Sequence, residues 1–317
     1  MRVVSSAVAR VGALAMLLVA AIAVTGCSVQ SGPANVGHTA AARPIVDPER
    51  VQVIPDLTYA TAGGVPLQLD ICKPVVQSKV ALSFRPAIVI IHGGSWLEGD
   101  KAEPQWRAVC EWLGAAGYVA AAVDYQLAPK FVYPTQITDV QEAVEWLRAP
   151  AQVKRFGIDR TLIGAFGGSA GGNLAGLLGT VGHGSLSTGS RVAAVAELSG
   201  PANLTASGAE RPVLRPRVLS YLGCRSYAAC PQAVAASPID NVDPSDPPFF
   251  IAHSTDELIP LSQSIDFVAR LRAAHIPVTF QTEPGDLHSI SMLNDTLRAQ
   301  IVDFFHTQLV HRTKGRS

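Results

Sequence analysis

A serine set among glycines is the first candidate for chemistry in this chain. Gly167-Gly168-Ser169-Ala170-Gly171 matches the pattern G-x-S-x-G. An apolar, strand-like run from Leu162 precedes it, and residues 174–181 follow with leucine and valine at the spacing of one helix face. A strand, a sharp turn and a helix in this order form a nucleophile elbow, which holds a serine hydroxyl clear of the backbone. We therefore expect Ser169 to be a nucleophile; the alternative is a glycine-rich loop that only packs a helix on a strand.

A serine nucleophile needs a histidine base and an acid that orients it. His288 lies in a loop directly after the last strand-like run, which makes it the best of the eight histidines. Asp256 follows the preceding strand-like run, and carboxyl ends of parallel strands meet at one edge of a sheet. We expect Asp256 to be the acid, although the adjacent Glu257 could serve in its place.

The reaction also needs N–H donors for a developing oxyanion. Ala170, directly after the nucleophile, supplies one backbone N–H. Gly93 and Gly94 follow another strand-like run and are expected to supply one or two more, with His92 organising their loop through hydrogen bonds. Trp96, just past these glycines, is expected to narrow the substrate pocket beside Ser169.

Apolar strand-like runs alternate with amphipathic helices along most of the chain. Residues 57–71 read as an antiparallel pair, and later strand-like runs fall at 87–91, 118–123, 192–198, 249–252 and 278–282. Continuous apolar strands separated by helices are typical of a mostly parallel sheet with helices on both faces, an α/β fold. Residues 201–246 interrupt the alternation and are rich in proline, arginine and serine. We expect this cap segment to be a small insertion over the active site.

Composition excludes several classes of protein. The chain has 317 residues, 48% of them hydrophobic, so it can bury a large core. Its formal net charge is zero and no basic stripe is present, which argues against a nucleic-acid partner. No spacing of cysteine and histidine indicates a metal site, and no motif indicates a cofactor.

The N-terminus resembles an export signal. Arg2 and Arg10 make the first ten residues positively charged, and residues 11–24 are apolar but short for a membrane span. Cys27 follows a small residue, as in the bacterial lipobox, so we expect cleavage before it, lipid on its sulfur and an exported, membrane-anchored protein; an ordinary secretory signal is the alternative. The expected divisions are a signal at 1–26, a tether at 27–50, a catalytic domain at 51–311 and a tail at 312–317.

Four cysteines remain after Cys27. Cys224 and Cys230 flank a short polar loop, and their pairing is expected in an oxidising compartment. Whether Cys72 pairs with Cys110 stays open, because Cys110 lies on an apolar helix face where free buried cysteine is common.

Five stretches together resemble a known family. They are His92-Gly93-Gly94-Ser95-Trp96, Gly99-Asp100-Lys101, residues 124–129, residues 167–172 and Asp256-Glu257-Leu258-Ile259-Pro260. They are similar to the α/β-hydrolase esterases related to hormone-sensitive lipase and to bacterial feruloyl- and acetyl-esterase-like carboxylesterases. The resemblance covers residues 57–309 and implies a serine carboxylic-ester hydrolase without a cofactor.

The resemblance also implies how the residues act. It makes Ser169, Asp256 and His288 the triad, in the chain order of α/β-hydrolases. Two departures stand out: Ser95 replaces a glycine found in many relatives, and the segment before Asp256 is about one residue shorter than usual. The large N-terminal helical cap of the hormone-sensitive-lipase group has no counterpart, so the feruloyl-esterase-like group fits better.

The expected reaction is hydrolysis of short-chain acyl or aryl esters through an acyl-enzyme. The arginine- and proline-rich cap segment lacks the wide apolar face of a lipase lid. An aryl-formamidase or amidase on the same fold is one alternative. A non-catalytic envelope lipoprotein is the other.

Overall fold

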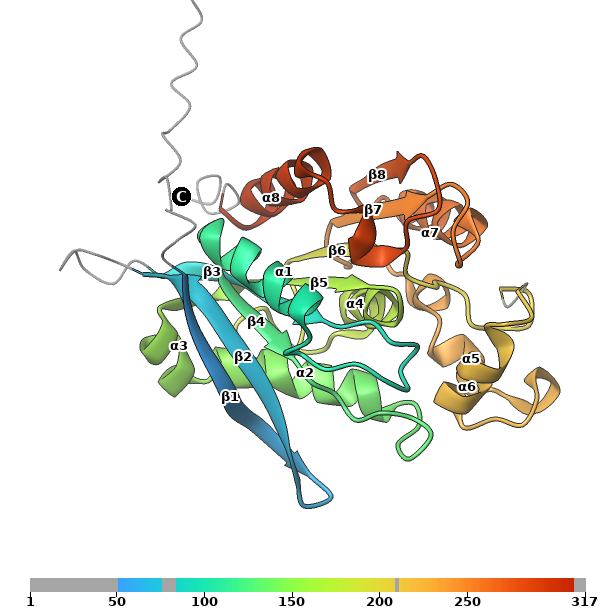
Figure 1. The fold of residues 1–317 in the computed structure, drawn as a ribbon, viewed down its shortest axis with the longest axis horizontal. Helices are drawn as coiled ribbons and strands as arrows, with labels where there is room; N and C mark the ends of the chain where they lie inside the picture. Colours follow the sequence, from blue (N-terminus) through green and yellow to red (C-terminus); the bar gives the residue numbers. More distant parts are fainter. Residues whose placement is uncertain (1–50, 76–83, 209–210, 311–317) are drawn as a thin grey trace, which may run out of the picture. The chain divides into compact units, whose positions relative to one another are not determined.

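A computed structural model describes residues 51–75, 84–208 and 211–310 of the chain (Figure 1). The predicted signal sequence, the lipidation site Cys27, the tether and the C-terminal tail lie outside the described residues. Within the described ranges, no helix combines the length and the apolar character needed to cross a membrane.

An eight-stranded sheet forms the centre of the fold, in the order β1-β2-β4-β3-β5-β6-β7-β8. The antiparallel hairpin of β1 (Val51–Ala62) and β2 (Val65–Pro74) turns at Gly63 and Gly64, which both have positive φ. β2 joins β4 in antiparallel fashion, and every later pairing is parallel. The remaining strands are β3 (Arg85–Ile91), β4 (Val119–Val123), β5 (Ile158–Gly168), β6 (Ala194–Leu198), β7 (Phe249–Ser254) and β8 (Val278–Glu283).

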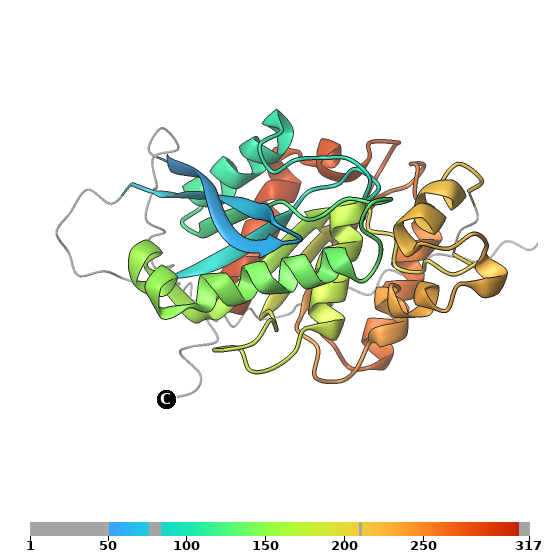
Figure 2. The same ribbon diagram turned by 90° about the horizontal axis from the view of Figure 1, so that it is seen from below.

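Helices cover both faces of this sheet, as predicted (Figures 1 and 2). Side chains alternate along a strand, so β3 sends Val89 into one core and Ile88 into the other. The first core also contains buried residues of α2 (Thr135–Arg148), α3 (Pro150–Phe156), α4 (Ala170–Val181) and α7 (Leu261–Ala273). The second contains those of α1 (Pro104–Ala115) and α8 (Asp295–Leu309). The central strands are buried on both faces, which explains their continuous apolar sequences.

The cap segment lies between β6 and β7 and contains α5 (Arg215–Leu222) and α6 (Gln232–Ala235). The predicted Cys224–Cys230 disulfide is present in it. The fully buried Tyr221 of α5 stacks on Trp96, with ring centroids 4.3 Å apart and an interplanar angle of 5°. This contact connects the cap segment to the loop that follows β3.

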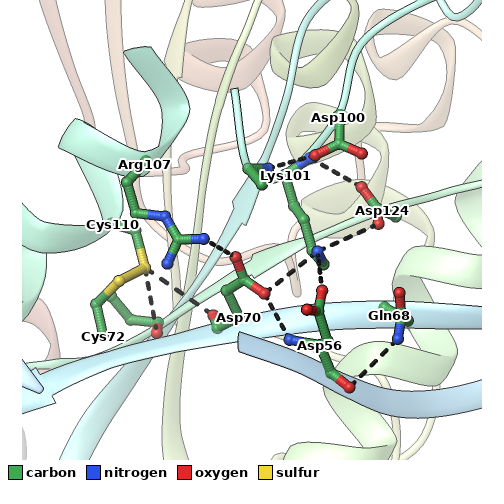
Figure 3. Close-up of polar contacts among 11 residues, drawn as sticks. Asp56, Gln68, Asp70, Cys72, Asp100, Lys101, Arg107, Cys110 and Asp124 are labelled. Carbon is green, nitrogen blue, oxygen red and sulfur yellow. Dashed lines mark hydrogen bonds and ion pairs between the residues drawn. A yellow bond between two sulfur atoms is a disulfide. The ribbon is translucent and has the colours of Figure 1, made fainter. Parts of the chain in front are cut away.

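The question left open for the other two cysteines is answered by a second disulfide. Cys72 on β2 is joined to Cys110 on α1, and both are fully buried. Beside it, Arg107 of α1 forms an ion pair with Asp70 of β2 (Figure 3). A covalent and an ionic link therefore hold the same helix to the same strand.

Lys101 lies in the same cluster, among three carboxylates (Figure 3). Its side chain is 4% exposed, and its Nζ is 2.9 Å from Asp56, 3.2 Å from Asp70 and 3.9 Å from Asp124. Burial alone would lower the pKa of this amine, but the hydrogen bond with Asp56 and the charges of the aspartates raise it instead. Lys101 is consequently held as a cation just beyond the loop after β3.

Candidate active site

The predicted nucleophile elbow is present at the junction of β5 and α4. Ser169 has φ 58° and ψ −123°, a conformation that costs energy in a residue with a side chain. Its N–H donates to the carbonyl of Leu198 at 2.8 Å, and its own carbonyl accepts from Asn173 at 3.0 Å. These bonds to β6 and to the first turn of α4 fix the strained residue where it stands.

Two glycines of the elbow are required by close backbone approach. A Cβ at Gly167 would clash with the carbonyl oxygen of Gly171, and a Cβ at Gly171 would clash with the carbonyl oxygen of Ile91. The strand, the turn and the helix can approach this closely only without side chains at these two positions. Close contact between backbone atoms therefore explains both glycines of G-x-S-x-G.

The loop of residues 92–96, here called the oxyanion loop, lies beside the nucleophile. A Cβ on Gly93 would be 3.4 Å from the Cβ of Ser169. Gly94, Ser95 and Trp96 all have positive φ, so the backbone turns sharply after β3. Gly93 therefore lies next to Ser169, the residue before α4, and Gly94 follows it at the turn.

His92 organises this loop, as predicted. Its ring stacks on Tyr125 with centroids 4.3 Å apart, and its Nδ1 is 2.7 Å from the carbonyl oxygen of Gly93. Burial lowers the pKa of His92 to about 4, so the ring is neutral and Nδ1–H donates to that carbonyl. The Tyr125 hydroxyl donates to the His92 carbonyl at 3.1 Å.

The predicted base, His288, has a carboxylate against its ring, but that carboxylate is not Asp256. The Nδ1 of His288 contacts Oε2 of Glu257, whose side chain is fully buried. An Nδ1–H that donates to a carboxylate leaves Nε2 unprotonated in the neutral ring, as a general base requires. The imidazole is 29% exposed, so it remains accessible from the solvent side.

The prediction that Asp256 orients the histidine is wrong. Asp256 is exposed, its N–H donates to the carbonyl of Gly285, and its carboxylate accepts from the Thr255 hydroxyl at 2.8 Å. The reason is the short segment after β7: only Thr255 separates Ser254, the last residue of this strand, from Asp256. The next residue, Glu257, is the first whose side chain turns inward. The sequence did contain a signal for Glu257, because the segment before Asp256 is about one residue shorter than in typical relatives.

A second histidine, not assigned a role from sequence, buries the other oxygen of Glu257. Nε2 of His253 is hydrogen-bonded to the carbonyl of Ile259 at 2.9 Å and lies 2.9 Å from Oε1 of Glu257. Burial alone would raise the pKa of Glu257, but hydrogen bonds from His253, His288 and Ser199 lower it. Glu257 is therefore kept as a carboxylate.

Ser199 connects the acid to the loop of the base. It follows β6 with φ 53°, and its hydroxyl accepts the N–H of Ser289 at 3.0 Å. Ser289 also lies against the elbow, because a Cβ on Gly168 would clash with its hydroxyl. The loop that carries His288 is thus held against the strand end that carries Ser169.

A pocket opens beside the nucleophile. It encloses about 340 Å³ including its opening to solvent, and it lies between Ser169, the oxyanion loop, the cap segment and the turn after β7. Its apolar lining includes Trp96, Leu214, Val218, Leu258 and Ile259. Trp96 therefore lines the pocket, as predicted, with its ring fixed on Tyr221. In the part of the chain that the structure describes, no group of histidine, cysteine, aspartate or glutamate side chains could hold a metal ion.

Comparison with known proteins identifies the family of this chain. Residues 69–271 match the family model BD-FAE. The chain is 32% identical over 246 residues to "Esterase LipC" of Mycobacterium tuberculosis, a match that covers 73% of this chain and 60% of that protein. The chain spans about half to three fifths of the length of this and two other curated relatives from the same organism.

Solved structures with the same fold are also found. A thermophilic esterase of Thermogutta terrifontis superposes with a TM-score of 0.66 at 25% identity, over 85% of this chain and 94% of that one. A carbohydrate esterase from gut microbiota superposes with a TM-score of 0.68 at 24% identity, over 82% of this chain and 96% of that one. The chain belongs to the BD-FAE family and has the α/β-hydrolase fold.

Proposed function

We propose that this protein is a serine carboxylic-ester hydrolase in which Ser169 is the nucleophile, His288 the base and Glu257 the orienting acid. The observations that support this most directly are a strained elbow serine and, on a loop held against the same strand end, a histidine whose Nδ1 faces a buried carboxylate. The names of relatives, which include esterases and a carboxylic ester hydrolase, support the same class of reaction.

The reaction proceeds in two halves. His288 takes the hydroxyl proton at Nε2 while Ser169 Oγ attacks the ester carbonyl, and Glu257 stabilises the imidazolium through Nδ1–H. The tetrahedral intermediate collapses, the alcohol leaves with the proton from His288, and an acyl-enzyme remains. Water then attacks the acyl group with His288 again as base, which releases the acid and restores Ser169.

The oxyanion is bound by backbone N–H groups. Ala170 begins α4, so its N–H is among those that a helix leaves without an internal acceptor. Gly93 lies beside Ser169, and Gly94 follows it in the oxyanion loop. Removal of one such donor typically costs about 10² to 10³ in rate.

The pocket supports short acyl or compact aryl groups as substrates. Trp96, Val218 and Ile259 enclose it, and all three are buried. Trp96 forms one wall and cannot easily swing away, because it is 3% exposed and stacked on a fully buried tyrosine. A long acyl chain would have to displace this wall.

The test compares wild type and Ser169→Ala on 4-nitrophenyl esters from acetate to palmitate and on acetanilide as an amide. Wild type should cleave the acetate and butyrate best, and the variant should lose at least about 10³ in kcat while its circular dichroism stays unchanged. A folded variant with near-normal turnover would refute the nucleophile. Maximal activity on the palmitate ester would refute the proposed preference for short acyl groups. Faster cleavage of the amide than of the esters would indicate an amidase.

We also propose that the protein is exported and anchored through a lipid on Cys27. Two disulfides among the described residues fit an oxidising compartment. A lipidated N-terminal peptide in mass spectrometry, and partition of the full chain into the detergent phase, are the expected results. An unmodified Cys27 in a water-soluble mature chain would contradict the anchor.

A further inference from the structure

We propose that the preferred substrates of this site are esters that carry a carboxylate, which the guanidinium of Arg217 binds while Ser169 attacks the ester carbonyl. This inference rests on the proposed function and adds the class of substrate to it. Among the described residues that line the pocket, Arg217 is the one charged side chain. It comes from α5 in the cap segment, and Ser169 comes from the elbow on the sheet, so the two line the same pocket from different parts of the fold.

The guanidinium of Arg217 has N–H groups that are not used in hydrogen bonds to the described residues. Its Nη1 is 3.3 Å from the hydroxyl of Ser95 and 3.4 Å from Oε1 of Glu98. Within the described residues, Nε and Nη2 of Arg217 have no hydrogen-bond partner. A carboxylate can therefore be bound by two parallel N–H groups, the geometry that distinguishes arginine from lysine in anion recognition.

The existing partner of Arg217 is a weak competitor. The side chain of Glu98 is 71% exposed and that of Arg217 is 47% exposed, so water screens their interaction. A substrate carboxylate that enters the pocket is transferred to a more apolar setting, where a charged hydrogen bond is stronger. We expect it to displace Glu98 from Arg217.

The charge of the lining also favours an anion. Apart from Arg217, its side chains are two serines and otherwise apolar groups. The lining thus offers a cation and no carboxylate, on walls that are mostly apolar. This favours an anionic substrate over a neutral one of the same shape.

The test uses two substrate pairs that differ only in charge. Monomethyl glutarate and methyl glutaramate place a carboxylate or an amide on the acyl side, and 3-acetoxybenzoate and 3-acetoxybenzamide place them on the alcohol side. Wild type should show kcat/KM at least about tenfold higher for the anion in one of the pairs. Arg217→Gln should reduce that ratio to near one and change the neutral ester by less than about threefold. Glu98→Gln should raise kcat/KM for the anion about two- to threefold, because it removes the competing carboxylate.

The control is Arg225→Gln, which removes an exposed charge from the same cap segment but not from the pocket. It should leave both ratios unchanged. If Arg217→Gln lowered kcat/KM equally for the anion and the amide, Arg217 would only support the oxyanion loop through Ser95, and the proposal would be overturned. A wild-type ratio near one in both pairs would also overturn it. Activity on 4-nitrophenyl acetate that depends on Ser169 would, in that case, leave the esterase assignment standing. A wild type inactive on every ester would refute both.

Discussion

Two buried carboxylates, Asp70 on β2 and Glu257 in the turn after β7, differ in the side chains that contact them. Around Asp70, the partners are the permanent cations Lys101 and Arg107. Around Glu257, the partners are the histidines His253 and His288. Both acids have almost fully buried side chains, so burial alone does not explain their different surroundings.

The choice of partner separates a structural cluster from a chemical one. A lysine or arginine keeps its charge across the physiological pH range, so the Asp70 cluster holds its charges while the protein works. A histidine can gain and lose a proton near neutral pH, which the proposed mechanism requires of His288. The comparison predicts that damage to the first cluster lowers stability, whereas damage to the second lowers the rate of ester hydrolysis.

The largest expected effect follows from Glu257→Gln. The amide would present an N–H to the ring of His288 and favour the tautomer with its proton on Nε2, which cannot act as a base. We expect kcat on 4-nitrophenyl acetate to fall by about 10³ to 10⁴, with a melting temperature high enough for assay at 25 °C.

The neighbouring Asp256→Asn is the matched control for that experiment. Asp256 is exposed and contacts Thr255, so its loss should change kcat by less than about threefold. If Asp256→Asn were the variant that lost activity and Glu257→Gln the silent one, the assignment of the acid would have to be reversed.

The next effect concerns stability. Lys101→Met would leave Asp124 and the buried Asp70 without their shared cation, and breaking a buried ion pair costs about 3–5 kcal/mol. Denaturant unfolding should register this loss, while kcat at 15 °C should stay within about tenfold of wild type. Lys154→Met, at an exposed site on α3, should change stability by less than about 0.5 kcal/mol. A stable Lys101→Met protein with a large loss in kcat would contradict the prediction that the Asp70 cluster supports stability rather than the reaction.

A somewhat smaller loss of stability is expected when the disulfide beside Asp70 is removed. Cys72 and Cys110 are 38 residues apart, against 6 for Cys224 and Cys230. Because a longer closed loop restrains the unfolded chain more, Cys72→Ala/Cys110→Ala should cost about 2–4 kcal/mol and Cys224→Ala/Cys230→Ala less. Unfolding in urea of both double variants checks the order. A larger loss from the cap segment pair would mean that the shorter loop does more to hold the fold.

The sequence predicted the parts of this molecule that depend on local chemistry. The glycines of the elbow follow from steric contact within one turn, and the buried strands follow from uninterrupted apolar runs. The position of Ser169 and the role of His92 could therefore be predicted from residues near them in the chain.

The parts that sequence missed depend on contacts between distant segments. Glu257 rather than Asp256 contacts His288 because it is the first residue after β7 whose side chain is directed into the protein. Ser199 acquires its role only because the loop of Ser289 packs on the end of β6. A charged residue inside the apolar run 194–198, Glu197, was the one local signal in this region, and it marks a buried carboxyl.

The smallest expected effect tests that carboxyl. Among the described residues, no cation or histidine forms an ion pair with Glu197. It is 1% exposed, its Oε2 accepts the N–H of Gly200 at 2.7 Å, and its Oε1 has no partner in the described ranges. Burial raises its pKa to about 8 from 4.5, the Gly200 bond opposes the rise, and the charge of Glu257 adds to it.

The raised pKa fixes the direction of the pH dependence. The folded protein retains this proton up to pH of about 8, whereas the unfolded chain loses it near 4.5. The stability that Glu197 contributes is therefore complete below pH 4.5 and is lost as pH rises through 8. Glu197→Gln keeps the shape and the acceptor for Gly200 without the ionisation, so at pH 8 it should be more stable than wild type by at least about 1 kcal/mol. At pH 4.5 the two should be nearly equal, and Glu111→Gln, at an exposed site on α1, should show no such trend. Urea unfolding at both pH values measures the difference, and an advantage that did not grow with pH would mean that Glu197 is ionised in the folded protein despite its burial.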